Sequence, residues 1–370
     1  MRRLILILAL VTGGCELGGE SYTWDLPPGF PEPEVPADNP MTEAKVELGR
    51  HLFYDPRLSG DETQSCASCH AQGLAFTDGL ALSVGSTGES TPRGSMSLAN
   101  VAYNSRQTWA NPVLVHLEDQ ALIPMFGEEP IELGTDEEAL LRRLAEDPAY
   151  PAMFEDAFPG DPDPISTGNV VRAIASFERT LISGDSAFDR YTYQGDDDAM
   201  SESARRGLEL FFSERLECFH CHGGFNFTDG VTHSGTVEPE VGFHNTGLYN
   251  IDGRGGYPEP NRGIYEHTGD RRDMGAFRAP TLRNIELTAP YMHDGSIATL
   301  DEVLDHYAAG GRTISEGPNA GVGSESPLKN LFIHGFELTE EERADVLALL
   351  RSLTDETFLN DPRFSDPFAE

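Results

Sequence analysis

Two short motifs of cysteine and histidine constrain this chain more than any other feature of its sequence. The first is Cys66-Ala67-Ser68-Cys69-His70, and Cys218-Phe219-His220-Cys221-His222 begins 152 positions later (218 minus 66). Two thiols at this spacing can each bond to a vinyl group of one porphyrin, and the histidine that follows then lies beneath the iron. The sequence therefore predicts two covalent c-type haems, attached through Cys66, Cys69, Cys218 and Cys221 and ligated by His70 and His222.

Two other uses of such motifs fit the sequence less well. A redox-active dithiol of the thioredoxin type would need a βαβ context, which the surrounding sequence lacks. A zinc site rarely has a histidine directly after the second cysteine. Covalent attachment of two haems is therefore the favoured interpretation.

Length and composition set the expected fold class. With 370 residues the chain can form two domains, each with its own core. Its 38 glycines and 25 prolines predict long loops. We expect a mainly α protein with two c-type cytochrome domains, one covalent haem in each, and long irregular loops.

The formal net charge of −36 is unusually negative. Such a surface repels nucleic acid and anionic lipid, and it attracts basic partners over long range. The sequence therefore predicts no nucleic-acid partner. A merely well-solvated acidic surface would have the same composition.

The fifth cysteine, Cys15, ends a segment typical of a secretory signal. Arg2 and Arg3 precede an apolar stretch, Leu4 to Val11, and small residues follow before Cys15. We predict a lipoprotein-type signal peptide over residues 1–15, with Cys15 as the lipid anchor, and a protein that is periplasmic or otherwise extracytoplasmic. Plain cleavage near this position is the alternative.

Changes in composition predict the domain boundaries. Residues 16–39 are rich in proline, glycine and acids, which is typical of a tether, with Trp24 as its one aromatic anchor. An N-terminal cytochrome c-like domain with the peroxidatic haem is expected over 40–195, a C-terminal haem domain over 196–353, and an acidic, loop-like tail over 354–370. The pattern Gly49-x-x-Leu52-Phe53 recurs as Gly207-x-x-Leu210-Phe211, which indicates two copies of one unit.

Capping boxes predict three helices. Thr135-x-x-Glu138, Thr299-x-x-Glu302 and Thr339-x-x-Glu342 each precede an apolar helical pattern. After Thr299, the residues Leu300, Val303, Leu304 and Tyr307 share one helix face, so Tyr307 is expected to point inward. A further helix is predicted after Asn39-Pro40, with these residues as its cap and first turn.

Three longer segments resemble the bacterial di-haem cytochrome c peroxidase superfamily. They are Phe53-Tyr54-Asp55-Pro56-Arg57-Leu58-Ser59, Ala279-Pro280-Thr281-Leu282-Arg283-Asn284 and Thr288-Ala289-Pro290-Tyr291-Met292-His293-Asp294-Gly295. The resemblance covers residues 40 to 353 in the same order. It implies an enzyme, a di-haem peroxidase. Where much of the superfamily has a methionine as ligand of the second haem, this chain has Tyr307, which resembles the MauG branch, and Tyr22 to Phe30 is similar to the MbnH subgroup within it.

The resemblance also implies a reaction. MauG-like enzymes oxidise residues of another protein, and MbnH converts a tryptophan of its partner MbnP to kynurenine. We therefore expect an enzyme that uses hydrogen peroxide to form a high-valent di-haem state and then oxidises a tryptophan of an MbnP-like partner by long-range electron transfer. The alternative is a peroxidase that takes electrons from a small cytochrome or copper protein. A pure electron carrier is disfavoured, because carriers have both irons capped.

The resemblance assigns further site residues. Gln120, Pro124 and Glu132 match residues over the first haem that assist peroxide cleavage, although Glu128 and Glu129 remain alternatives to Glu132. Trp109 matches a tryptophan that lies between the haems. Asn100, with the backbone carbonyls of Thr288 and Pro290, matches a calcium site between the domains, whose oxygen ligands suit a hard cation.

The sixth ligand of each iron is expected to differ. Tyr307 is the candidate at the second haem, with Met274, Met292 and His306 as rivals, and His306 is expected on the helix flank away from the apolar stripe. At the first haem the family's removable histidine is replaced in Thr91-Pro92-Arg93. Threonine is no haem ligand, so the resemblance implies an open sixth position there. His51 and His116 are interpreted as surface or packing residues.

Overall fold

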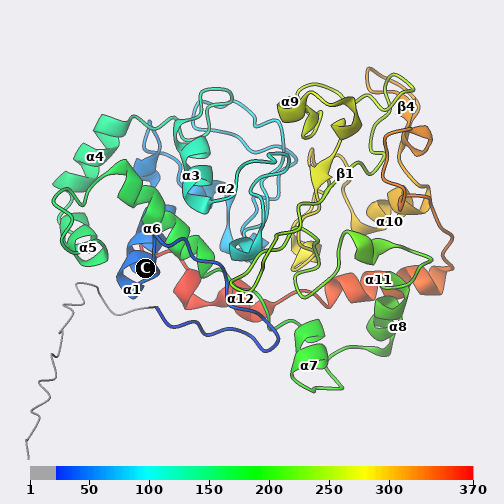
Figure 1. The fold of residues 1–370 in the computed structure, drawn as a ribbon, viewed down its shortest axis with the longest axis horizontal. Coiled ribbons are helices and arrows are strands. Elements are labelled where there is room, and N and C mark those ends of the chain that lie inside the picture. The colour runs from blue at the N-terminus through cyan, green and yellow to red at the C-terminus, as the bar shows by residue number, and fades with distance from the viewer. Residues whose placement is uncertain (1–21, 370) are drawn as a thin grey trace, which may run out of the picture.

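The protein folds into two helical domains that lie side by side (Figure 1). The computed structural model describes residues 22–369, so the predicted signal peptide and Cys15 lie outside the described residues. Its α-helices are α1 (Glu43–Tyr54), α2 (Cys66–Cys69), α3 (Leu117–Phe126), α4 (Glu137–Glu146), α5 (Tyr150–Ala157), α6 (Thr167–Arg179), α7 (Ala187–Tyr193), α8 (Glu202–Phe211), α9 (Tyr265–Thr268), α10 (Leu300–Ala308), α11 (Glu340–Arg351) and α12 (Glu356–Asn360).

Strands are few and short. β1 (Phe243–His244) pairs antiparallel with β2 (Phe277–Arg278), and β3 (Thr313–Ile314) pairs antiparallel with β4 (Gly321–Val322). Long irregular segments connect the helices, so the predicted fold class is confirmed. Between residues 22 and 369, no helix combines the length and the apolar character needed to cross a membrane.

Each domain has its own hydrophobic core. In the first, residues of α1, α3, α4, α5 and α6 pack together, with Leu48, Leu52 and Phe53 of α1 fully buried. In the second, residues of α7, α8, α10 and α11 form the core, including Phe211 and Leu349. The cores lie on opposite sides of the interdomain region, and each is next to one cysteine–histidine motif.

The repeated glycines mark the same helix crossing in both domains. Gly49 of α1 lies against α6, where an added methyl group would overlap the carbonyl oxygen of Ala173. Gly207 of α8 lies against α11, where a methyl group would overlap the carbonyl oxygen of Asp345. In each domain the helix that leads into the haem motif thus crosses a second helix in close contact, which supports the predicted internal repeat.

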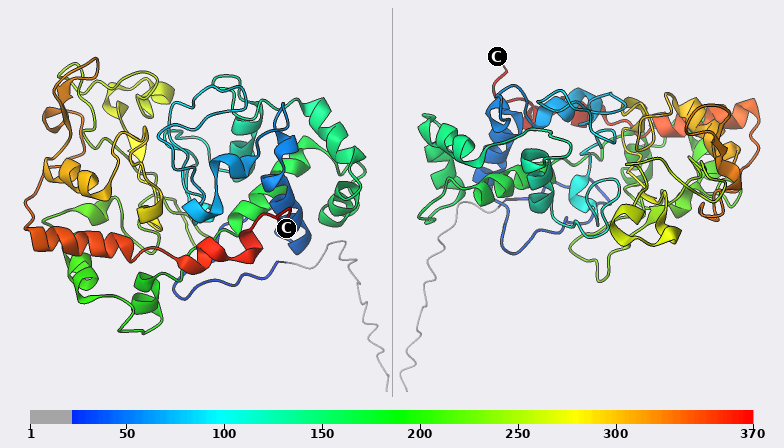
Figure 2. Two further views of the ribbon diagram at one scale, coloured as in Figure 1. Left: turned by 180° about the vertical axis from the view of Figure 1, so that it is seen from behind. Right: turned by 90° about the horizontal axis from the view of Figure 1, so that it is seen from above.

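The domain boundaries differ from those expected. Leu181 packs in the first core and Phe188 of α7 packs in the second, so the chain enters the second domain between these residues rather than at 196. The tail is not a loop: it forms α12 and returns to the first domain, where Phe358 and Phe364 join the core (Figure 2). Composition could not predict this, because the contacts join residues about 300 positions apart, such as the Tyr54 hydroxyl and the carbonyl of Phe364.

The segment predicted as a tether is packed against both domains over its described part, residues 22–39. Its buried aromatic residue is Phe30 rather than Trp24. The Arg283 guanidinium lies 4.8 Å from the centre of the Phe30 ring. Tyr103 donates a hydrogen bond to the carbonyl of Pro31, and Glu32 accepts one from the backbone of Ser234. This segment therefore acts as a strap across the interdomain region.

Two of the predicted capping boxes are confirmed, at Thr299 and Thr339. The other two helix starts were wrong by a few residues. α1 is capped by Thr42, while Asn39 instead bonds to Glu118. α4 is capped by Asp136, because the Thr135 hydroxyl donates to the carbonyl of Leu58.

The close helix crossings give a stability prediction. Gly49→Ala should lower the free energy of unfolding by about 1–3 kcal/mol, because a methyl group at this position overlaps backbone rather than a movable side chain. Gly168→Ala, in the first turn of α6, is the matched control, since only the flexible end of Arg172 lies near it. Urea unfolding followed by far-ultraviolet circular dichroism measures both. Equal stability of Gly49→Ala and the wild type would contradict the close packing.

Candidate functional site

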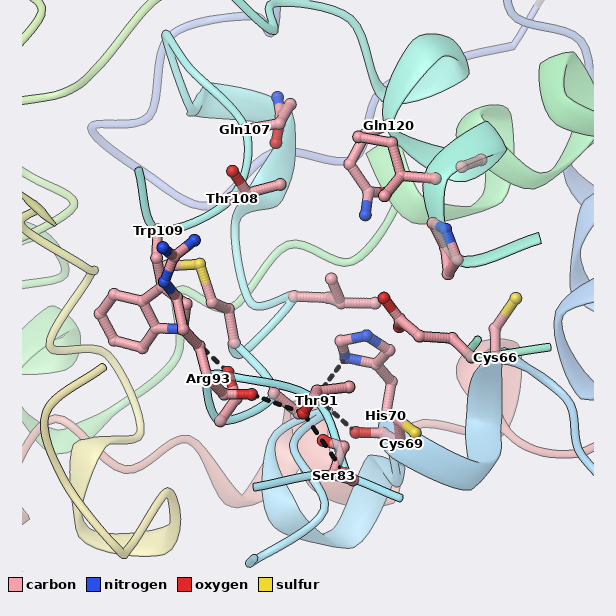
Figure 3. A pocket seen from close by; sticks show the side chains of 18 of the residues that line it. Cys66, Cys69, His70, Ser83, Thr91, Arg93, Gln107, Thr108, Trp109 and Gln120 are labelled. Atoms are coloured by element: carbon pink, nitrogen blue, oxygen red, sulfur yellow. Dashed lines mark hydrogen bonds between the residues drawn. The ribbon is translucent and has the colours of Figure 1, made fainter. Parts of the chain in front are cut away.

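The two cysteine–histidine motifs line two separate cavities, one in each domain. The first cavity, of about 500 Å³, is bordered by Cys66, Cys69 and His70. The second, of about 180 Å³, is bordered by Cys218, Cys221 and His222. Figure 3 shows the first cavity, with His70 and Gln120 approaching the same space from different elements.

Both motif histidines are oriented in the same way. The Nδ1 atom of His70 lies 2.8 Å from the carbonyl oxygen of Phe76, and Nδ1 of His222 lies 3.1 Å from that of Phe227. A hydrogen bond from Nδ1 to a carbonyl fixes the tautomer in which Nε2 is free to bind a metal. The arrangement therefore fits a haem iron in each cavity.

The thiols also fit covalent haem attachment better than the alternatives. Burial raises the pKa of Cys69 to about 11 and that of Cys218 to about 12, and it raises the pKa of Cys66 still further. A redox dithiol or a zinc site depends on thiolates, which require a lowered pKa. The motifs thus present neutral thiols at the wall of a porphyrin-sized space.

The first cavity contains the residues expected over the iron. Gln120 and Pro124 of α3 line it, and so does Glu132 in the loop that follows. Glu129 is exposed and also contributes to the lining, whereas Glu128 is exposed and does not. Burial raises the pKa of Glu132, so this carboxyl group holds its proton to higher pH than an exposed one. The geometry favours Glu132 among the three acids.

The loop Thr91-Pro92-Arg93, in which threonine stands where the family has a removable histidine, brings no iron ligand into this cavity. The Thr91 hydroxyl donates to the carbonyl of Arg93 at 2.8 Å, so it is turned toward its own backbone (Figure 3). Of the histidines in the described part of the chain, only His70 and the exposed His267 contribute to the lining. His51 and His116 do not, as expected.

Sequence reasoning missed one acid. Glu178 on α6 is 5% exposed and lines the first cavity, and its Oε2 atom has no partner among the described residues. Burial raises its pKa to about 8. The adjacent Arg179 does not neutralise it, because that guanidinium pairs with Glu118 at 2.7 Å. The sequence pattern that could have identified Glu178 is its position four residues after Ile174, which places a glutamate on the apolar face of the helix.

Tyr307 lines the second cavity together with His222. Its hydroxyl makes no hydrogen bond to a described residue, although buried tyrosines usually find such a partner. Burial raises the pKa of the phenol well above its usual value. A tyrosine in this position is available to an iron held by His222.

The rival ligands are placed differently. Met292 also lines the second cavity, whereas Met274 and His306 do not. His306, expected on the helix flank away from the apolar stripe, is 4% exposed, so that flank is buried as well. Both of its ring nitrogens are buried without a partner among the described residues.

Trp109 lies between the two cavities and contributes to the lining of both. Its indole nitrogen donates to the carbonyl of Gly94 at 2.8 Å, which fixes the orientation of the ring. The tryptophan predicted to lie between the haems therefore does lie between the two cavities.

The residues predicted to bind calcium are not brought together. Thr288 and Pro290 line a small third cavity of about 70 Å³ between the domains, but Asn100 does not. The Asn100 side chain instead bonds to both backbone groups of Ser183 and to Asn226. The assignment of Asn100 to a calcium site stays a prediction, and its amide group here belongs to a buried hydrogen-bond network. Asp78 is the one carboxylate in the described lining of the third cavity.

Comparison with known proteins agrees with this site. Residues 43–198 match the family model for di-haem cytochrome c peroxidase. The chain is 35% identical to the methylamine utilization protein MauG of Methylorubrum extorquens, over 88% of this chain and 82% of that protein. It is also 35% identical to the cytochrome-c peroxidase IdrP1 of Denitromonas iodatirespirans, over 98% of this chain and 96% of that one.

A solved structure is more similar still. The crystal structure of a MauG-like protein associated with microbial copper homeostasis is 52% identical, with a TM-score of 0.92, and covers 94% of this chain and 100% of that one. Two cavities, each with a covalent attachment motif, define a di-haem c-type oxidoreductase. The chain belongs to the di-haem cytochrome c peroxidase family, whose members include MauG.

The second cavity gives a prediction about ligation. Tyr307→Phe should change the low-spin haem signal in electron paramagnetic resonance, because the phenol oxygen is lost from the site opposite His222. Tyr265→Phe is the control, since this tyrosine lies on α9 and lines neither haem cavity. An unchanged signal in Tyr307→Phe would leave Met292 as the ligand.

Proposed function

We propose that this protein uses hydrogen peroxide to oxidise a tryptophan of an MbnP-like partner protein to kynurenine, by electron transfer through its own structure. The observation that carries the proposal is the position of Trp109 between a polar, acid-lined cavity and a cavity lined by Tyr307. The 52% identical MauG-like structure, which is associated with copper homeostasis, supports the same reading.

The chain's own residues divide the work in the first cavity. When bound, the haems supply peroxide activation and the storage of oxidising equivalents. Gln120 orients the peroxide through its amide group, and Glu132 accepts and returns a proton as the O–O bond breaks. Glu178 holds a second proton in the same cavity, because burial keeps its carboxyl group neutral around pH 7.

A folded partner cannot enter either cavity, so we propose that it docks on the second domain. A series of stacked side chains leads there from the cavity wall: Phe332 lies 3.8 Å from His220, His220 lies 4.1 Å from Phe219, and Phe219 lies 6.2 Å from Phe212, measured between ring centres. Phe212 is 42% exposed. A partner that covers it comes close to the second cavity while presenting its tryptophan.

Trp109→Phe tests this route. The variant should attach both haems and still react with peroxide in the first cavity, but oxidation of the partner tryptophan should be lost, because the ring between the cavities is no longer readily oxidised. Mass spectrometry of the partner measures the conversion, because kynurenine has one oxygen atom more and one carbon atom less than tryptophan, the carbon leaving as formate. The chain's one other tryptophan supplies the control, Trp24→Phe, which alters the strap and neither cavity.

Equal modification by Trp109→Phe and the wild type would exclude the route. The second candidate function, a peroxidase that takes electrons from a small cytochrome or copper protein, is favoured by the 35% identity to a cytochrome-c peroxidase. The two are separated by adding peroxide to the ferric protein without a reductant. The proposed enzyme changes the absorption of both haems, and Trp109→Phe changes only that of the first.

We also propose that calcium binds in the third cavity without Asn100. No hydrogen bond from a described residue ends on the carbonyl oxygens of Thr288 or Pro290, which leaves both free for a hard cation beside Asp78. Asp78→Asn should therefore lower the calcium content of the purified protein, measured by elemental analysis, while Asn100→Asp should not. Unchanged calcium in Asp78→Asn would refute this site.

The proposed location is extracytoplasmic, where c-type haems are attached. Lipid anchoring at Cys15 belongs to the same proposal.

A further inference from the structure

Arg278 is a buried cation at the boundary of all three cavities. It follows Phe277 in β2, is 4% exposed, and lines the first, second and third cavities. Trp109 is another residue that lines all three. Arg278 therefore lies in the wall that separates the two haem sites.

The guanidinium also holds the chain around Trp109. Its Nε atom donates to the carbonyl of Thr108 at 3.1 Å, and Nη1 donates to Oδ1 of Asn104 at 3.0 Å. The backbone N–H of Arg278 donates to the carbonyl of Trp109 at 2.9 Å. Arg278 thus holds the backbone before and after Trp109, through its guanidinium to the carbonyl of Thr108 and through its own N–H to the carbonyl of Trp109.

No carboxylate of the described chain forms an ion pair with this guanidinium. The nearest acid is Asp229, whose charge acts on the guanidinium although its Oδ2 atom pairs with His244, and the nearby Arg93 pairs with Glu266. Asp78, on the wall of the third cavity, accepts from Leu80 and Ser83. Burial lowers the pKa of Arg278 to about 10, so it is still charged at neutral pH.

A buried charge without a counterion is costly, and proteins rarely keep one. The neutral acceptors on Arg278 are Thr108, Asn104 and the sulfur of Met96 at 3.5 Å, and none of them carries a charge. Asp229 acts on this guanidinium without forming an ion pair with it, so the adjoining cavities are where a direct counterion can be supplied. A porphyrin of the haem type brings carboxylate groups, which a guanidinium binds in a forked geometry.

We propose that Arg278 is a positioning residue shared by both haem sites. Its guanidinium pairs with the carboxylate groups of the porphyrins bound in the two cavities, and it also holds Trp109 between them. This inference rests on haem in both cavities and does not depend on the partner or the oxidised residue. A single charge on a shared wall acts on both irons, since it stabilises the reduced form of each.

The test is a potentiometric titration of the holoprotein, with the two haems distinguished by their spectra. Arg278→Gln removes the charge but keeps a side-chain donor, and it should lower the midpoint potentials of both haems. Arg93→Gln is the matched control, because Arg93 lines the first cavity but neither of the others and already has Glu266 as its counterion. It should leave the potential of the second haem unchanged.

Arg278→Lys provides a second, independent measurement should Arg278→Gln fail to accumulate with both haems attached. Burial lowers the pKa of a lysine more readily than that of an arginine, into the pH range over which the potentials can be measured. In this variant both potentials should fall together as the pH rises and the lysine loses its proton, whereas in the wild type the arginine keeps its charge through the same range.

Two results would overturn the proposal. One is a pair of midpoint potentials in Arg278→Gln equal to those of the wild type, or a shift confined to one haem. The other is an Arg278→Lys protein whose two potentials follow the same pH profile as the wild type. A residue with a merely structural role would lower the unfolding temperature and leave both potentials in place.

Discussion

The relative position of the two domains depends on one buried carboxylate. Asp355 is 2% exposed, and its Oδ2 atom accepts hydrogen bonds from the Ser183 hydroxyl and from the backbone N–H groups of Gly184 and Asp185, at 2.9–3.1 Å. Residues 183–185 form the connection out of the first domain, and Asp355 lies on the connection back into it. A single side chain therefore ties both chain crossings together.

Neighbouring amides extend this network into both domains. The Asn284 side chain donates to the Ser183 hydroxyl and accepts from the backbone N–H of Asp355. The Asn100 side chain donates to the backbone carbonyl of Ser183 and to the side-chain oxygen of Asn226. Next to it, the fully buried Arg283 pairs with Asp189 at 2.8 Å. A buried polar network is costly when some of its groups lack hydrogen-bond partners, and only one arrangement of the two domains supplies all of them. The network therefore fixes the position of the two cavities relative to each other. The proposed electron transfer between two haems requires that fixed separation.

Local signals in the sequence predicted most of the units from which this arrangement is built. The attachment motifs and the capping boxes at Thr299 and Thr339 act over a few residues, and the glycines at Gly49 and Gly207 could be found because a short pattern around each is repeated. Tyr307 and Trp109 could be located because they lie at fixed positions in segments that resemble a known family. Helical periodicity then indicated that Tyr307 points inward.

Features that depend on distant contacts were not predictable in the same way. The acidic tail resembles a loop in composition, yet Phe358 and Phe364 complete a core formed by helices at the other end of the chain. Asn100 was predicted as a calcium ligand from the resemblance to a known family, and its hydrogen bonds to the backbone of Ser183, 83 positions away, could not be foreseen from that match. Arg278 and Glu178 carry their significance only through burial, which follows from the packing of both domains.

The structure finally explains how two copies of one unit come to differ chemically. Each copy has a helix, a glycine crossing and a haem motif, so the proximal sides of the cavities are alike. The opposite sides come from unrelated segments. In the first domain, α3, its following loop and α6 bring Gln120, Glu132 and Glu178 to the cavity, where we propose that they bind peroxide and move protons. In the second, α10 and α11 bring Leu304, Tyr307 and Leu350, and of the three tyrosines in the described lining only Tyr307 has a hydroxyl without a hydrogen-bond partner among the described residues. Duplication thus supplied two places for haem, and the divergent walls supplied two different tasks.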